Sequence, residues 1–127
     1  MTEDRFDHLA PCPRSPNCVC SDAPDASHRI EPFRLTGDAA AGWARIRKTL
    51  ERQPRTRLIS ATDRYLHAEV RSRIFRFVDD LELLLSPDDG TVAVRSASRL
   101  GHSDFGVNRK RVERLRRLLA GQGAISG

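Results

Sequence analysis

Between Tyr65 and Leu100 the chain reads YLHAEVRSRIFRFVDDLELLLSPDDGTVAVRSASRL, and apolar and polar side chains alternate along most of it. Alternation with a period of two residues is typical of β-strands that bury one face. The sequence PDDG at 87–90 separates two such runs and predicts a hairpin turn. We expect four strands, at 56–62, 65–72, 74–85 and 91–100. The connections are too short for parallel crossovers, so the sheet should be antiparallel.

Two amphipathic helices flank this region. In the segment 39–53, Trp43, Ile46 and Leu50 fall within one arc of a helical wheel, and basic residues lie opposite. The second helix is expected at 108–120 and ends at the glycine-rich sequence that follows. Both helices should pack on the same face of the sheet.

The chain divides into three parts. Residues 1–27 hold four prolines and all three cysteines, which predicts an irregular N-terminal arm. Residues 28–121 should form a single α+β domain, in which 28–35 is a short edge segment because of Pro32. We expect 122–127 to be a disordered tail. The predicted fold class is therefore α+β, with a four- to five-stranded antiparallel sheet, two helices on one face and a Pro/Cys-containing arm.

The composition limits the classes of function. The 127 residues carry 22 basic and 17 acidic side chains, for a net charge of +5. No apolar run approaches the length of a membrane span, and no secretory signal is visible, so a cytoplasmic location is the default expectation. Tyr65 is the one aromatic ring expected on the helix-free face, which argues against specific nucleic-acid binding.

The strand alternation assigns side chains to faces. Asp79 falls on the core face, in line with Leu81 and Leu83, whereas Asp80 falls on the opposite face. Arg111 lies within the apolar arc of the second helix and needs a buried acceptor. We therefore predict a structural ion pair between Asp79 and Arg111.

One group of polar residues suits an anionic ligand. Arginine forks with hydroxyl and amide donors are the groups that bind carboxylate or phosphate. The expected ligand-binding residues, at one end of the sheet, are Arg71, Ser72, Arg95, Ser98, Arg99, Asp104 and Asn108. The alternative is a polar network that fastens the 101–106 loop to the sheet. The first hypothesis is a non-enzymatic module that binds a small anion or a protein partner.

A second group of residues allows metal or redox chemistry. Cys12, Cys18, Cys20 and His28 are donors that zinc, copper(I) or iron accept. Their spacing is not that of a zinc knuckle, and a Cys12–Cys18 disulfide or three free thiols are equally simple states. The alternative hypothesis is a metal- or redox-linked protein, with a thiolate- and histidine-bound metal as its cofactor.

Signs of catalysis are weak. Adjacent residues on a strand point to opposite faces, so Asp79 and Asp80 cannot form an acid/base pair on a regular strand. The strand serines have no evident histidine partner, and His102, on a loop, is the nearest candidate. We therefore lean against an enzyme.

Four stretches resemble a known family. They are PCPRSPNCV (11–19), HRIEPF (28–33), RSRIFRFVDDLE (71–82) and VRSASRLGHSDFGVNRKRVERLR (94–116). They resemble the uncharacterised bacterial and plastid family DUF1499, over about Pro11 to Leu118. The resemblance implies no activity or ligand. The chain departs from the family at Cys20, where a small polar residue is expected, and it lacks the export or membrane segment that many relatives carry.

The family pattern singles out a set of positions that includes both candidate groups. The positions are Cys12, Pro16, Asn17, Cys18, His28, Arg71, Ser72, Asp79, Asp80, Arg95, Ser96, Ser98, Arg99, Gly101, Asp104, Gly106, Asn108 and Arg111.

Overall fold

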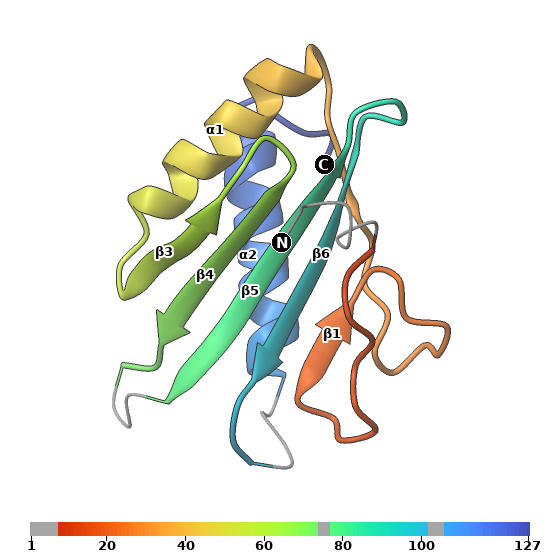
Figure 1. Ribbon diagram of the computed structural model, residues 1–127, viewed down its shortest axis with the longest axis vertical. Coiled ribbons are helices and arrows are strands. Elements are labelled where there is room, and N and C mark those ends of the chain that lie inside the picture. Colours follow the sequence, from red (N-terminus) through yellow and green to blue (C-terminus); the bar gives the residue numbers. More distant parts are fainter. Residues whose placement is uncertain (1–7, 74–76, 102–105) are drawn as a thin grey trace.

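The structure is a computed structural model that describes residues 8–73, 77–101 and 106–127. Figure 1 shows a twisted sheet with helices behind it. The elements follow one another as β1 (Cys18–Cys20), β2 (Phe33–Arg34), α1 (Ala39–Glu51), β3 (Thr56–Ala61), β4 (Tyr65–Arg71), β5 (Val78–Ser86), β6 (Thr91–Ser98) and α2 (Val107–Gly121).

The described strands form one antiparallel sheet of six strands. Their order is β1-β6-β5-β4-β3, and β2 also pairs with β6 beyond the end of β1. The hairpin of β5 and β6 is in register from Asp79 opposite Ser98 to Ser86 opposite Thr91. Gly90 has a φ of 68° in the connecting turn, a conformation that glycine adopts without strain. The predicted α+β class and antiparallel sheet are confirmed.

The two shortest strands add to the predicted sheet. β1 lies inside the arm that we expected to be irregular, and it pairs with β6 through Val19 opposite Ser96. β2 is the part of the 28–35 segment that follows Pro32. Both have three residues or fewer, so neither carries an alternation pattern that would reveal it, and pairing with β6 is what defines them.

Both helices cover the same face of the sheet, as expected (Figure 1). The Asp38 carboxylate accepts a hydrogen bond from the Ala41 N–H at 2.9 Å and caps α1. The α1 side chains of Trp43, Ile46 and Leu50 are buried. The core between the helices and the sheet also holds side chains of β4, β5, β6 and α2, namely Leu66, Ala68, Leu81, Leu83, Leu85, Val92, Val94, Val112, Leu115 and Leu119.

The predicted alternation of faces applies within β5 but not before it. Asp79, Leu81 and Leu83 face the core. Phe77, expected on the same face, is 51% exposed, because β5 begins at Val78 and the pleat does not extend to the residue before it. Phe75 lies outside the described residues.

The face of the sheet without helices, here called the open face, is partly covered by the N-terminal arm. Leu9, Cys20 and Ala23 form a second buried cluster there with Tyr65 and Leu84. The arm follows the side of β1 and β6 in Figure 1.

Residues 122–127, for which we expect a disordered tail, include an isoleucine that packs against the body. Ile125 is 2% exposed and pairs with Leu35 in an isolated antiparallel bridge. The Ser126 N–H donates to the Arg34 carbonyl at 2.9 Å. The buried Ile125 and the backbone hydrogen bonds to the 34–36 segment place these residues, and no periodicity in the sequence predicts such a contact.

Candidate functional site

The polar side chains beneath α2 form one hydrogen-bonded network. The Asn108 amide oxygen accepts from the Ser96 hydroxyl at 2.6 Å, and its nitrogen donates to the Ser98 hydroxyl at 2.9 Å. The same nitrogen donates to the Asn17 carbonyl at 3.2 Å. Asn108 and Ser96 have no exposed surface, so these bonds satisfy groups that burial would otherwise leave unpaired. The network fastens α2 to β6 and to the arm.

The predicted contact between Asp79 and Arg111 is part of this network. Arg111 Nη2 lies 2.7 Å from Asp79 Oδ2. Its Nη1 donates to Asn108 Oδ1 at 2.7 Å and to the Ser96 hydroxyl at 3.1 Å. The side chains of the two charged residues are 14% and 9% exposed, so each charge depends on the other for compensation.

On the open face Arg99 is held between two acids. Its guanidinium donates to both Asp80 oxygens, at 2.8 and 2.9 Å, and to Glu69 Oε2 at 2.6 Å. His67 Nε2 lies 2.7 Å from Asp80 Oδ1. The hydrogen bonds from Arg99, followed by that from His67, hold the pKa of Asp80 below its ordinary value. The arginine is neutralised within the fold.

Arg95 is paired as well. Its Nη1 lies 3.3 Å from Glu82 Oε1, directly across the β5–β6 ladder, and its Nη2 donates to the Pro11 carbonyl at 3.3 Å. Tyr65 donates a short hydrogen bond to the other Glu82 oxygen. Burial and the neighbouring carboxylate raise the pKa of Tyr65 well above its ordinary value. The phenol therefore stays a hydrogen-bond donor at neutral pH.

The seven expected ligand-binding residues are consequently distributed over three places. Ser98 and Asn108 lie in the network beneath α2. Arg95 and Arg99 lie on the open face and are paired with acids. Arg71 and Ser72 lie at the end of β4, beside a groove on the helix side. Asp104 lies outside the described residues.

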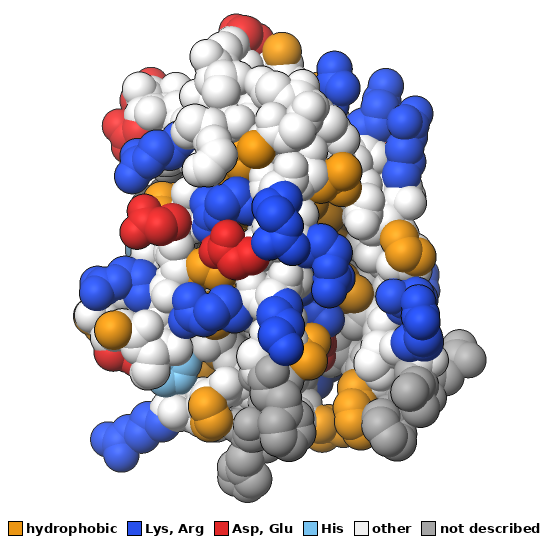
Figure 2. Space-filling model, turned by 180° about the vertical axis from the view of Figure 1, so that it is seen from behind, with side chains coloured by type: hydrophobic (Ala, Val, Ile, Leu, Met, Phe, Trp, Pro, Cys, Tyr) orange, Lys and Arg blue, Asp and Glu red, His pale blue; other side chains and the backbone are white. Residues whose placement is uncertain are grey.

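The groove, here called the arginine groove, opens between α2, the end of α1 and strands β3 and β4. Its volume is about 270 Å³. Leu50, Val70, Leu81, Val107, Leu115 and Leu118 form its apolar lining. Five arginines surround this lining, namely Arg55, Arg71, Arg73, Arg111 and Arg114. Figure 2 shows this side of the molecule, where Lys and Arg side chains gather over α2 beside hydrophobic ones.

The charges of the groove are mostly uncompensated. Arg111 is paired with Asp79. Within the described ranges, the guanidinium groups of the other four arginines make no hydrogen bond or ion pair. No Asp or Glu is among the described residues that line the groove. A concentration of positive charge beside apolar surface favours a ligand that carries both an anionic group and an apolar part.

Arg55 occupies an unusual backbone position at the rim of the groove. Its backbone φ of 54° lies in the left-handed region, which residues other than glycine and asparagine rarely adopt. The Arg55 carbonyl accepts a hydrogen bond from the Arg71 N–H at 2.9 Å, so this conformation links the start of β3 to the end of β4. The hydrogen bond brings the backbones of two of the groove's arginines together.

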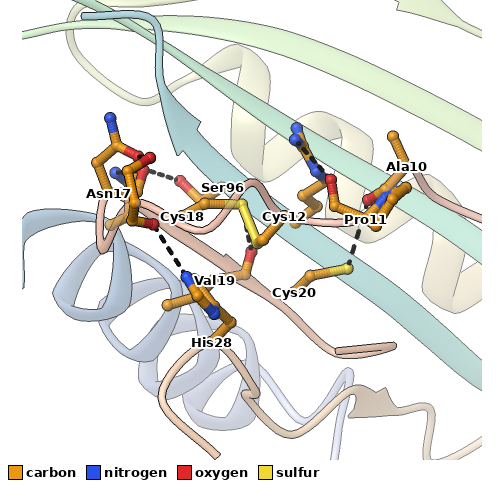
Figure 3. The surroundings of a disulfide bond; sticks show 12 residues. Ala10, Pro11, Cys12, Asn17, Cys18, Val19, Cys20, His28 and Ser96 are labelled. Atoms are coloured by element: carbon orange, nitrogen blue, oxygen red, sulfur yellow. Dashed lines mark hydrogen bonds between the residues drawn. A yellow bond between two sulfur atoms is a disulfide. The ribbon is translucent and has the colours of Figure 1, made fainter. Parts of the chain in front are cut away.

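The cysteine group is resolved into a disulfide and one thiol. Cys12 and Cys18 are disulfide-bonded, and Cys20 is free and buried (Figure 3). The disulfide holds the arm against β1. Burial raises the pKa of the Cys20 thiol, which disfavours the thiolate form that attacks electrophiles and binds metals. Among the described residues no group of three His, Cys, Asp or Glu side chains is arranged to hold a metal ion.

His28 closes the loop of the arm rather than joining the sulfur atoms. Its Nδ1 lies 2.5 Å from Asp25 Oδ2, and its Nε2 lies 2.9 Å from the Ser15 carbonyl. Two acceptors favour the doubly protonated ring, so the Ser15 carbonyl and then Asp25 raise the pKa of His28. Hydrogen bonds from Ser27 and His28 lower the pKa of Asp25 to about 2.

Sequence reasoning did not select three of the groove residues. These residues are Arg55, Arg73 and Arg114. Arg55 directly follows Pro54, and Arg73 follows Arg71 by two residues. That clustering of arginines near strand ends is the one signal that could have suggested a basic rim.

Comparison with known proteins adds a family. No curated protein and no solved structure matches the chain. Within the described residues no helix is both long enough and apolar enough to cross a bilayer. A family model matches residues 8–119, which include every described element up to the last turn of α2. The chain therefore belongs to the family described as protein of unknown function (DUF1499).

Proposed function

We propose that the protein binds a small amphipathic anion, a carboxylate or phosphate that carries an apolar chain, in the arginine groove. The observation that carries the proposal is the set of guanidinium groups around an apolar lining that have no partner among the described residues. The proposal keeps Arg71 and Ser72 from the group expected from sequence and replaces the other members with Arg55, Arg73 and Arg114.

The distribution of charge supports this site over the open face. Arg95 and Arg99 already bind Glu82, Asp80 and Glu69, and a ligand anion would have to displace those carboxylates. In the arginine groove an anion would instead meet guanidinium groups from which no described carboxylate has to be displaced. Bidentate hydrogen bonds from arginine to a carboxylate or phosphate are roughly twice as strong as neutral hydrogen bonds.

The size and the lining of the groove define the apolar part of the ligand. A volume of about 270 Å³ lies at the small end of ligand sites in proteins. Leu118 and Val107 are 38% and 46% exposed at its edge, so covering them with an alkyl chain would remove apolar surface from water. A short-chain amphiphile satisfies both requirements.

Octanoate is a suitable probe, with octanol and acetate as its two halves. Titration into the full chain, followed by calorimetry and by backbone amide shifts, should show octanoate binding more tightly than either half. Removing one guanidinium contact should weaken octanoate binding about tenfold, because a charge-assisted hydrogen bond contributes about 1.5 kcal/mol. The test variants are Arg71→Ala and Arg114→Ala.

Arg117→Ala is the matched control, because Arg117 is exposed on the same helix but is not among the groove residues. The proposal requires that this variant bind octanoate like the unmodified chain. Equal binding of octanoate and octanol would show that the arginines do not contribute. Amide shifts confined to the open face would place the ligand elsewhere.

A further inference from the structure

The large apolar side chains that lie exposed in the described part of the chain gather mainly at one end of the molecule. Leu100 is 71% exposed, Phe77 is 51% exposed and Val107 is 46% exposed. At this end β4 and β6 finish, and β5 and α2 begin (Figure 1). Gathered apolar groups mark an interaction surface more reliably than scattered ones.

Hydrogen bonds hold the segments that carry these side chains together. The start of β5 is joined to the end of β6 by the bond from the Arg99 N–H to the Val78 carbonyl, at 3.3 Å. The segment after β6 is joined to α2 through Asn17. Its side chain donates to the Gly101 carbonyl at 2.6 Å, and its own carbonyl accepts from Asn108 at 3.2 Å. Phe77, Leu100 and Val107 are each adjacent in sequence to one of these hydrogen-bonded residues. The three apolar side chains therefore lie at the same end of the molecule.

The same end is positively charged. Arg71 is the last residue of β4, Arg73 follows two residues later, and Lys110 lies in the first turn of α2. All three side chains are exposed. Gly106 supplies no capping side chain to α2, and the first turn contains no acidic residue. The positive end of the helix dipole therefore adds to the basic side chains. Figure 2 shows basic and hydrophobic side chains next to one another near this lower end.

The described acids nearest this end do not neutralise it. Asp79 is bound to Arg111, and Asp80 is bound to Arg99. Each of these carboxylates is committed to a cation of the fold. The charge of the exposed Arg71, Arg73 and Lys110 therefore remains available to an external partner.

We propose that this end of the molecule, formed by Phe77, Leu100, Val107, Arg71, Arg73 and Lys110, docks on an anionic lipid surface. The apolar tips would enter the boundary between headgroups and acyl chains, and the basic side chains would contact the lipid phosphates. Val107 also lines the arginine groove, so the groove opens toward the lipid from which an amphipathic anion could come. The inference goes beyond the proposed function, because Leu100 and Lys110 lie outside the groove.

Charge favours a lipid partner over the other occupants. A second copy of the chain would bring the same basic groups together, and like charges repel. A nucleic acid would bind the basic groups, but its bases stack on aromatic rings and not on an aliphatic side chain such as Leu100. A membrane surface uses both.

The test is sedimentation of the full chain with sucrose-loaded vesicles. One set is pure phosphatidylcholine, and the other is phosphatidylcholine mixed with an equal amount of phosphatidylglycerol. The protein should sediment with the anionic vesicles and stay in solution with the neutral ones. Leu100→Ser should weaken the partition coefficient about tenfold, and Lys110→Glu should weaken it at least fivefold.

Two matched variants control for these changes. Ile59 is 45% exposed on β3, and Arg117 is exposed farther along α2, so Ile59→Ser and Arg117→Glu alter similar side chains elsewhere. Both should partition like the unmodified chain. Equal weakening by Arg117→Glu would mean general charge attraction and would overturn the proposal. Absence of binding to anionic vesicles, a dimer that Leu100→Ser dissociates, or binding to a nucleic acid that ignores Leu100→Ser would also overturn it.

Octanoate titration separates this inference from the proposed function. Leu100→Ser and Lys110→Glu should bind octanoate normally, because neither residue lines the groove. Normal octanoate binding without vesicle binding would overturn the docking surface alone. Vesicle binding without octanoate binding would overturn the groove alone.

Discussion

Arg111 of α2 and Asp79 of β5 form a 2.7 Å ion pair at the boundary between the hydrophobic core and the arginine groove. Arg111 lines the groove, yet its charge is used inside the fold. Of the five arginines that line the groove, Arg111 holds the helix to the sheet. The charges of the other four have no partner among the described residues.

Replacing Arg111 should destabilise the fold strongly. Arg111→Leu leaves the Asp79 carboxylate buried without its cation, which should lower the free energy of unfolding by about 3 kcal/mol. Urea denaturation followed by the fluorescence of the buried Trp43 measures the change. Arg117→Leu, an exposed change on the same helix, should cost no more than about 0.5 kcal/mol.

The double variant Asp79→Asn, Arg111→Leu gives the internal check. Removing the second charge should recover part of the loss, because no unpaired buried charge remains. If the double variant loses the sum of the two single losses, the two residues are not coupled.

The faces of the sheet could be predicted because strand alternation is a local property. The side chains of Asp79 and Arg111 were matched from two periodicities alone, one of two residues and one of 3.6. The helical period of 3.6 residues also predicts that Arg116 lies on the outer face of the last helix. In the structure its guanidinium donates to the Glu31 and Pro32 carbonyls and lies 4.9 Å from the Phe33 ring centroid. Periodicity does not reveal a neighbouring segment that covers a helix face.

The candidate site was less predictable than the fold. The arginine groove is formed by the start of β3, the end of β4 and one side of α2, and these come together only when the helices settle on the sheet. Ser98 and Arg99 are adjacent in sequence and were assigned to one site. At the end of β6 they point to opposite faces of the sheet, Ser98 toward Asn108 and Arg99 toward Asp80. Neighbouring polar residues on a strand are therefore poor guides to a shared pocket.

The disulfide between Cys12 and Cys18 should stabilise the arm measurably. It closes a short loop, and removing it should lower the free energy of unfolding by about 2 kcal/mol. Urea denaturation with and without dithiothreitol measures this loss. Cys20→Ala should keep the response to the reductant, whereas the double variant Cys12→Ser, Cys18→Ser should lose it. Alkylation of three thiols in unreduced, denatured protein would show that the bond is absent.

His28 should make stability depend on pH. Its pKa is raised in the folded state above the ordinary 6.5. A raised folded-state pKa contributes stability that is fully present below the unfolded value and is lost as the pH rises through the folded value. The melting temperature of His28→Gln should therefore fall below that of the unmodified chain, by more at acidic than at alkaline pH. His8→Gln, which changes an exposed ring in the same arm, should follow the unmodified chain. A pH-independent gap between His28→Gln and the unmodified chain would contradict the assignment.

Arg55 allows backbone strain to be separated from charge. Its φ of 54° suits glycine, and an L-residue pays about 1 kcal/mol for the left-handed region. Arg55→Gly and Arg55→Ala both remove the guanidinium from the groove, but only glycine also relieves the backbone. The glycine variant should be the more stable of the two by about 0.5 kcal/mol, after allowance for the greater entropy of glycine in the unfolded chain. Both variants should bind octanoate with the same reduced affinity, because the lost charge is the same. A difference in their octanoate affinities would show that the backbone at Arg55, and not its charge, shapes the groove.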